Sequence, residues 1–167
     1  MLQMDYKNFP YRIGFGVDVH QLVSDRKLII GGVELEADFG ALGHSDADVL
    51  LHAVCDAMLG ALNLRDIGFH FSDKDPKYKN IDSTILLRDS FALVKNKGYL
   101  LGNLDCTVIL EKPKVNPHIP AMQKIIAEIL ESNEDQISIK ATTHEQVDSF
   151  GQSKAVKAYA TCILYRS

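Results

Sequence analysis

Two short patterns in the N-terminal third of the chain place imidazole and carboxylate side chains at spacings that suit a metal ion. Asp18 and His20 are two residues apart in a segment typical of a strand, so both side chains point to one face. His52 falls in a predicted helix, in a polar row with Asp48 and Asp56 at four-residue spacing. Two histidines and an aspartate with an open fourth position are typical of catalytic zinc. Each pattern alone is also typical of a hydrogen-bonded pair or a solvated helix face.

The beginning of the same helix suits a phosphate group. His44 and Ser45 precede it, and Ser45 followed by Asp48 resembles a capping box. A helix N-terminus presents unpaired N–H groups and a partial positive charge, and a capping serine leaves some of those groups free. We also expect Asp48 or Asp56 to orient the His52 ring by contacting it on the side away from the ion.

Two later segments carry further polar groups. The loop 66–75 is rich in carboxylates, which suit sugar hydroxyls, although a solvated turn has the same composition. In the segment 140–145, two threonines and Glu145 follow a predicted strand. Hydroxyls and a carboxylate at a strand end could bind phosphate and a hard cation such as magnesium. Threonine is also common in strands without any such role.

Composition narrows the class of protein. The 167 residues suit one domain, and 46% hydrophobic residues are enough for a core. A net charge of −4 without a basic stripe argues against nucleic-acid binding. No apolar run is long enough to span a membrane, and the N-terminus does not resemble a signal peptide, so we expect a cytoplasmic protein. The three cysteines are widely separated, which predicts buried, reduced thiols.

The hydrophobic pattern predicts an α+β fold: a single domain with a mixed β-sheet and helices packed on one face. We expect strands over 11–19, 27–30, 33–36, 104–110, 137–143 and 155–165, and helices over 46–62, 83–97 and 117–131. Gly31-Gly32 marks a turn, and 63–80 reads as a polar loop whose length suggests a function. Pro117 suits the first turn of the third helix.

Five motifs, in order and at matching distances, point to one family. They are Arg12 to His20, Gly43 to Ala53, Asp66 to Pro76, Pro113 to Pro120 and Lys140 to Thr143. Together they resemble the 2-C-methyl-D-erythritol 2,4-cyclodiphosphate synthases of the non-mevalonate isoprenoid pathway. The resemblance covers about residues 11–147, so we take 11–167 as the synthase domain and 1–10 as an N-terminal extension.

The resemblance implies an intramolecular phosphoryl transfer. The 2-phosphate of 4-diphosphocytidyl-2-C-methyl-D-erythritol 2-phosphate attacks the β-phosphorus of its own diphosphate, and CMP leaves. Cations and fixed donors suit a reaction that forces two anionic groups together. A non-catalytic relative that binds a nucleotide or an isoprenoid diphosphate is the alternative. A generic metal phosphohydrolase is a third hypothesis.

The same resemblance assigns roles to residues. Asp18, His20 and His52 match zinc ligands, His44 and Thr143 match catalytic stabilisers of the transition state, and Glu145 matches the ligand of a second ion, Mg²⁺ or Mn²⁺. Substrate contacts are implied for Asp18, Val19, His20, His44, Ser45, Asp66, Ile67, Gly68, Phe71, Ser72, Asp73, Lys74 and Asp75. The cytidine pocket is implied for Leu110, Glu111, Lys112, Pro113, Lys114, Val115 and Asn116, and the phosphate end for Thr142, Thr143, His144 and Glu145.

The family resemblance also implies a homotrimer with active sites between subunits. Its central cavity can bind an isoprenoid diphosphate, but the chain departs from the family beyond Glu145. The arginine expected there is replaced by Gln152. We therefore assign no site to Ser149 or Gln152. Lys154 could supply some positive charge, without the planar fork of arginine.

Overall fold

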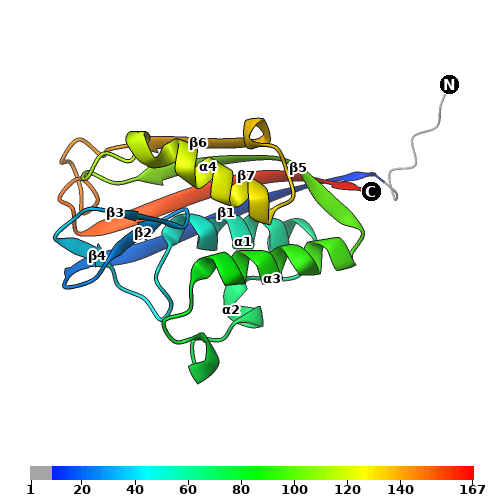
Figure 1. Ribbon diagram of the computed structural model, residues 1–167, viewed down its shortest axis with the longest axis horizontal. Helices are drawn as coiled ribbons and strands as arrows, with labels where there is room; N and C mark the ends of the chain where they lie inside the picture. The colour runs from blue at the N-terminus through cyan, green and yellow to red at the C-terminus, as the bar shows by residue number, and fades with distance from the viewer. Residues whose placement is uncertain (1–8) are drawn as a thin grey trace.

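A long antiparallel strand pair forms the centre of the sheet (Figure 1). In the computed structural model, which describes residues 9–167, β1 (Tyr11–Ser24) pairs with β7 (Ala155–Arg166). On the far side of β7, β5 (Tyr99–Ile109) pairs antiparallel with it, and β6 (Ile137–Thr142) pairs parallel with β5. The short β4 (Phe39–Ala41) extends the other edge, which gives the order β4-β1-β7-β5-β6. A separate hairpin joins β2 (Leu28–Ile30) to β3 (Val33–Leu35).

The helices lie on one face of this sheet (Figure 1). The main ones are α1 (Val49–Ala61), α3 (Ser83–Asn96) and α4 (Ile119–Ile129). The shorter ones are α2 (Ile67–His70), η2 (Pro76–Tyr78), η3 (Asn116–His118) and η4 (Glu134–Gln136). Helix α1 packs against β1 and β7, α3 packs against α1, and α4 covers β6. The predicted single-domain α+β fold with a mixed sheet is confirmed.

Glycines on β1 allow strand and helix backbones to touch. A Cβ atom on Gly14 would lie 1.8 Å from the carbonyl oxygen of Ala57, and one on Gly16 would lie 2.0 Å from that of Ala53. Only glycine avoids these clashes, and the two alanines present the smallest side chains to the strand. This close packing brings the middle of β1 beside α1, where the candidate metal ligands lie.

Several predicted boundaries were wrong. Strand β1 continues to Ser24 because its last residues pair with β4, which the sequence did not reveal. Helix α1 starts at Val49 rather than near residue 46, and its cap is Asp48 rather than Ser45. The expected loop 63–80 contains α2 and η2. Pro117 lies in η3, so the proline in the first turn of α4 is Pro120 instead. Strand β5 begins at Tyr99, five residues before the predicted start.

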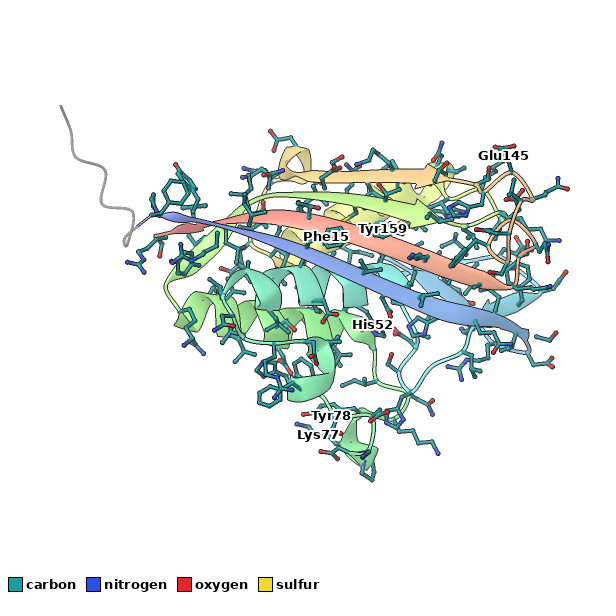
Figure 2. All side chains as sticks on the ribbon, turned by 180° about the vertical axis from the view of Figure 1, so that it is seen from behind. Phe15, His52, Lys77, Tyr78, Glu145 and Tyr159 are labelled. Atoms are coloured by element: carbon teal, nitrogen blue, oxygen red, sulfur yellow. The ribbon has the colours of Figure 1, made fainter. Side chains whose placement is uncertain are left out.

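The other face of the sheet is apolar and open in the single chain. Along β1, Ile13, Phe15 and Val19 are 72%, 63% and 51% exposed. Phe15 stacks on Tyr159 of β7, with ring centroids 6.1 Å apart, and both rings stand on this face (Figure 2). Contiguous exposed apolar surface of this kind is typical of a protein–protein contact.

Two expectations about composition can be compared with the described residues. Cys55, Cys106 and Cys162 are all buried and free, as expected, and burial raises the pKa of Cys55 to about 12. Among residues 9–167, no helix is both long and apolar enough to cross a membrane. The boundary of the N-terminal extension stays a prediction, because residues 1–8 lie outside the described part of the chain.

Candidate active site

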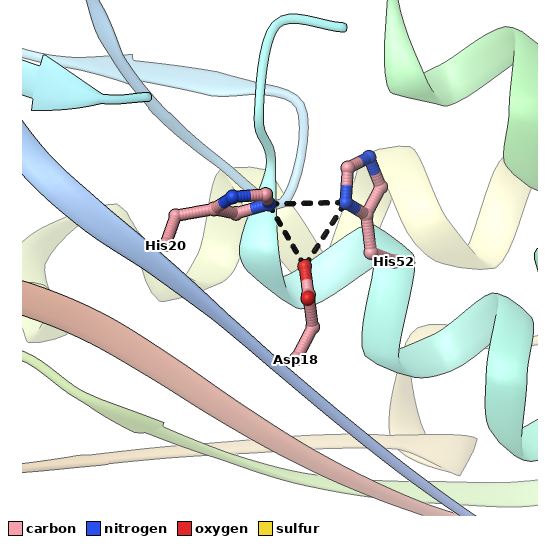
Figure 3. Close-up of side chains that lie close together, drawn as sticks. All are labelled: Asp18, His20 and His52. Carbon is pink, nitrogen blue, oxygen red and sulfur yellow. Dashed lines mark hydrogen bonds and ion pairs between the residues drawn. The ribbon is translucent and has the colours of Figure 1, made fainter. Parts of the chain in front are cut away.

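Three side chains from β1 and α1 converge on one point (Figure 3). The Oδ2 atom of Asp18 lies 2.9 Å from Nε2 of His20 and 3.0 Å from Nδ1 of His52. The two ring nitrogens are 3.2 Å apart. Among the described residues, these three form the one group of ligand-type side chains close enough to share an ion. The predicted convergence of Asp18, His20 and His52 is therefore confirmed.

Without a bound ion, the surroundings of Asp18 and His52 favour the charged form of each side chain. Burial raises the pKa of Asp18, but hydrogen bonds and charges from His20 and His52 outweigh it and lower the value to about 2. Burial lowers the pKa of His52, but the Asp18 carboxylate and the nearby acidic groups raise it overall. A cation in the centre would replace the protons that now hold these groups together.

The outer contacts of His52 differ from the prediction, and no outer contact was predicted for His20. His20 Nδ1 lies 3.0 Å from the carbonyl oxygen of Leu42. Such a bond, with Nδ1–H as donor, leaves Nε2 free for a metal. His52 Nε2 lies 2.9 Å from Ser83 Oγ and 3.1 Å from Ser45 Oγ. The sequence pattern had not indicated any role for Leu42 or Ser83.

Asp48 and Asp56 are not the hydrogen-bond partners of His52 that we predicted. Both Oδ atoms of Asp48 accept backbone N–H groups, from the Gly31-Gly32 turn and from the first turn of α1. Asp56 accepts the N–H of Ile67, 2.7 Å away, and so holds the start of α2. Both carboxylates stabilise backbone segments around the site.

The beginning of α1 is not the open phosphate site that the sequence suggested. The Asp48 carboxylate already occupies the N–H groups of Leu50 and Leu51. Ser45 instead forms a local turn in which its Oγ accepts the N–H of Ala47 at 3.0 Å. Ala47 has φ +59°, which interrupts the helical backbone and delays the helix to Val49.

A cavity of about 310 Å³ opens beside the metal cluster and contains two of the predicted phosphate residues. Its wall is formed by His44, Ser45, His52, Ile67, Gly68, Phe71, Asp73, Tyr78, Ile81 and Leu86. The Nε2 atom of His44 is buried and has no hydrogen-bond partner among the described residues. A buried ring nitrogen without a partner is costly unless a ligand or water supplies one. The His44 ring, which lines the cavity, therefore keeps a hydrogen-bonding atom available for a polar ligand.

The loop 66–75 divides between cavity wall and local turns. Ile67, Gly68, Phe71 and Asp73 line the cavity. Other side chains of the loop accept backbone N–H groups two or three residues further along. Asp66 accepts the N–H of Phe69 at 2.8 Å, and Asp75 accepts the N–H of Lys77 at 3.0 Å. Ser72 accepts the N–H of Lys74 at 3.2 Å. The sequence could not separate these two groups, because both have the composition of a solvated turn.

A second cavity of about 210 Å³ lies at the ends of β5 and β6. Leu110, Lys114, Val115, Asn116, Ala141, Thr142 and Thr143 line it. Backbone pairing holds the two segments together, since the N–H of Leu110 donates to the carbonyl of Thr142 at 3.1 Å. Glu111, Lys112 and Pro113 complete the same loop without lining the cavity, and the buried Oε2 of Glu111 has no partner among residues 9–167.

The two halves of the predicted site are separated in one chain. Strands β7 and β5 lie between β1 and β6, so three strand spacings, roughly 14 Å, separate the two strands. Figure 2 shows Glu145 at the far edge of the molecule from His52. Thr143 Oγ1 donates to Glu145 Oε1 at 2.7 Å. Val19 points to the open sheet face, on the side of β1 opposite to Asp18 and His20.

Beyond Glu145 the chain folds into a compact turn. Asp148 accepts from Phe150 N–H at 2.9 Å and from Gly151 N–H at 3.1 Å, and its Oδ2 lies 2.8 Å from His144 Nδ1. On the neighbouring strand, Lys157 lies over the Phe150 and Tyr159 rings. His144 is thus engaged within the turn, and its predicted substrate contact stays a prediction.

The fold and the site define an α+β protein with a two-histidine, one-aspartate cluster positioned to bind a metal, beside a largely apolar cavity that His44 and Ser45 also line. Residues 11–165 match the sequence profile of the YgbB family. The 2-C-methyl-D-erythritol 2,4-cyclodiphosphate synthase of Parabacteroides distasonis is 57% identical over 155 residues, which are 93% of this chain and 96% of that protein. The chain therefore belongs to the YgbB family, the family of cyclodiphosphate synthases.

Solved structures agree with this assignment. The bifunctional IspDF of Campylobacter jejuni superposes with a TM-score of 0.91 at 36% identity, and covers 96% of this chain. The match spans only 43% of that longer chain. A CDP complex of IspF from Plasmodium falciparum superposes with a TM-score of 0.84 at 35% identity, over 95% of this chain and 97% of that one.

Proposed function

We propose that this chain is a cyclodiphosphate synthase of isoprenoid precursor biosynthesis. It converts 4-diphosphocytidyl-2-C-methyl-D-erythritol 2-phosphate to 2-C-methyl-D-erythritol 2,4-cyclodiphosphate and CMP. The observation that carries the proposal is the convergence of Asp18, His20 and His52 beside a cavity lined by His44, whose buried Nε2 has no partner among the described residues. The family membership supports the same reaction.

The ligand atoms of the three-residue cluster fit a zinc ion. In a tetrahedral zinc site, neighbouring nitrogen and oxygen ligands are roughly 3.3 Å apart. The distances between the atoms of Asp18, His20 and His52 are 2.9, 3.0 and 3.2 Å. These residues would hold the ion, and its charge would polarise the diphosphate and orient it for attack.

The cavity residues would position the reacting phosphates. His44 lines the cavity, and its buried, unpartnered Nε2 would donate to a phosphate oxygen whose charge grows during the transfer once the bound substrate brings the ring toward it. Ser45, also in the wall, would donate its hydroxyl to the same group. The apolar side chains of Ile67, Phe71 and Leu86 would exclude water and hold the substrate folded. The loop residues Asp66 to Asp75 would bind the methylerythritol unit.

The second cavity is the proposed cytidine pocket. The CDP complex of the Plasmodium falciparum protein supports a cytidine nucleotide as part of the substrate. Leu110 to Asn116 would surround the base, and Thr142 and Thr143 would contact the phosphates. Glu145, which already accepts a hydrogen bond from Thr143, would bind Mg²⁺ or Mn²⁺ together with the diphosphate.

We further propose that three chains assemble and share their active sites. The two half-sites lie on opposite sides of the sheet centre in one chain, and the open apolar face carries the surface needed for assembly. A neighbouring chain would bring its Thr143–Glu145 segment to the metal cluster of this one. A cytoplasmic location and an isoprenoid diphosphate in the trimer centre also stay predictions.

The test is incubation of the purified protein with the diphosphocytidyl substrate, Zn²⁺ and Mg²⁺. The proposal expects CMP and the cyclic diphosphate in equal amounts, and loss of both in His52→Ala together with the tightly bound metal. A metal-loaded protein that binds CDP without turnover would support the non-catalytic alternative, which is motivated by the altered segment 146–155. Phosphate release from simple monoesters would support a phosphohydrolase.

A further inference from the structure

A partly buried hydrogen-bond chain runs from the His52 ring through Ser83 to the carboxylate of Asp46. His52 Nε2 lies 2.9 Å from Ser83 Oγ, and the Ser83 hydroxyl donates to Oδ1 of Asp46. Ser83 is fully buried, at the first residue of α3. We propose that Asp46 and Ser83 are positioning residues, which fix the plane and tautomer of His52 so that Nδ1 faces the metal site.

The direction of each hydrogen bond follows from the chemistry of the three groups. An ionised carboxylate only accepts, so the Ser83 hydroxyl proton points to Asp46. The Ser83 oxygen then accepts the N–H of His52 Nε2. A neutral imidazole with its proton on Nε2 has its lone pair on Nδ1, which is the atom 3.0 Å from Asp18 Oδ2. The chain thus selects the tautomer that a metal ligand at Nδ1 requires.

The backbone around Asp46 keeps this chain in place. Asp46 Oδ2 accepts the N–H of Ser83 at 3.0 Å, so one carboxylate holds both the hydroxyl and the backbone of the same residue. The N–H of Asp46 donates to the carbonyl of Ile81 at 3.1 Å, and that of Asn80 donates to the carbonyl of His44 at 2.7 Å. The start of α3 is therefore tied to the segment that carries the phosphate residues.

Ser45 is the competing partner for the same ring nitrogen. Its Oγ is 3.1 Å from His52 Nε2, but it also accepts the N–H of Ala47 and lines the ligand cavity. A hydroxyl at the cavity wall is free to rotate toward a bound phosphate. The Asp46–Ser83 chain instead has all its described partners inside the protein, so it can hold His52 in the same orientation with or without substrate.

The experiment compares Ser83→Ala with Ser90→Ala. Ser90 lies on the same helix and is also fully buried, and its hydroxyl lies by the Cys55 thiol rather than by His52, so its loss controls for a missing oxygen in the core. Zn²⁺ affinity is measured by competition with a chromophoric chelator on the full chain. We expect Ser83→Ala to weaken zinc binding by about 10- to 100-fold and Ser90→Ala to leave it within about twofold.

A spectroscopic readout separates orientation from general stability. In the zinc-loaded wild type, the His52 Nε2–H proton should appear far downfield and exchange slowly with water. We expect this signal to broaden or disappear in Ser83→Ala and to persist in Ser45→Ala. Asp46→Asn, a neutral acceptor, should give an intermediate loss of affinity, and it should add little further loss in the Ser83→Ala background.

The outcomes distinguish this inference from the proposed function on which it rests. Absence of tight zinc in the wild type would contradict the proposed metal site. Tight zinc in the wild type and equally in Ser83→Ala, or loss of the downfield proton in Ser45→Ala alone, would overturn the positioning role of Ser83 and leave the metal site intact. If Ser83→Ala does not fold, the Asp46→Asn titration and the wild-type signal decide the same question.

Discussion

Gly16 of β1 lies directly against the backbone of Ala53 in α1, and a Cβ atom at Gly16 would fall 2.0 Å from the Ala53 carbonyl oxygen. Asp18 and His20 follow Gly16 on the same strand, and His52 precedes Ala53 on the helix. The distance between strand and helix at this contact therefore sets the distance between the candidate metal ligands. A small change in this strand–helix distance should therefore change the geometry of the site.

We predict that Gly16→Ala separates β1 from α1 and weakens both folding and metal binding. The clash is with backbone, which cannot rotate away, so the loss of unfolding free energy should be about 3 kcal/mol, measured by urea denaturation. Gly60→Ala is the matched control on α1, because nothing lies within 4 Å of its added Cβ. That variant should be neutral or gain up to about 1 kcal/mol from helix propensity. Equal stability of the two variants would contradict the role of the contact.

A second prediction concerns Asp48, whose carboxylate joins the Gly31-Gly32 turn to the first turn of α1. It is fully buried and accepts four backbone N–H groups. In Asp48→Asn the amide can accept at one atom only, so at least one buried N–H loses its partner. We expect a loss of about 3 kcal/mol in unfolding free energy.

The control for Asp48 is the exposed cap of α3. Asp82 accepts the N–H of Thr84 at 2.8 Å and is accessible to water, which can replace the bond. Asp82→Asn should cost less than about 1 kcal/mol. A similar cost for the two variants would show that Asp48 is an ordinary cap and not a buried connection between two segments.

The third prediction is a pH dependence of the metal-free protein. The partners of Asp18 lower its pKa from 3.8 to about 2 in the folded state, so its contribution to stability is present above pH 4 and is lost as pH falls toward 2. The contribution is about 2 kcal/mol. Unfolding free energies of the chelator-treated protein and of Asp18→Asn, measured from pH 2 to 6, should converge at the acid end.

Asp56 gives the opposite sign and so serves as a control. Burial raises its pKa in the folded protein, although the Ile67 N–H lowers it in part. Its ionisation therefore costs stability as pH rises through the unfolded value of 3.8. In Asp56→Asn, this loss of unfolding free energy with rising pH should be absent. In Asp18→Asn, by contrast, it is a gain of unfolding free energy with rising pH that should be absent. Parallel curves for wild type and Asp18→Asn would contradict the ion-pair account of the cluster.

The sequence predicted the three converging side chains of the candidate metal site better than the residues that hold them. Asp18 and His20 have strand spacing, and His52 lies outside the apolar stripe of its helix, so local pattern made all three candidates and the family resemblance then selected them. Ser83 is 31 residues from His52, and only tertiary packing of α3 against α1 brings them together. No periodicity in the sequence encodes that contact.

The errors at the start of α1 have a local cause. Ser45 and Asp48 are both common capping residues, and spacing alone does not decide between them. The decision comes from Ala47, whose positive φ breaks the helical path, and from the distant glycine turn that binds the other side of Asp48. In the same way, the three residues of β4 form a strand only because β1 offers a partner.

The last prediction tests whether chains share active sites. His52→Ala removes a metal ligand, and Glu145→Gln removes the proposed second-ion ligand about three strands away, so each homotrimer should be inactive. If a site takes His52 from one chain and Glu145 from its neighbour, random 1:1 mixed trimers contain intact sites in about a quarter of positions. The mixture, prepared by joint refolding, should regain about a quarter of wild-type CMP production.

Two controls make the complementation decisive. Mixing His52→Ala with His20→Ala, which alter the same half-site, should restore nothing. Phe15→Asp, which places a charge on the open sheet face, should prevent assembly and so abolish complementation when present in both partners, as size-exclusion chromatography with light scattering would show. If well-mixed trimers show no complementation, each chain builds its site alone. Movement within one chain would then have to close the roughly 14 Å between β1 and β6.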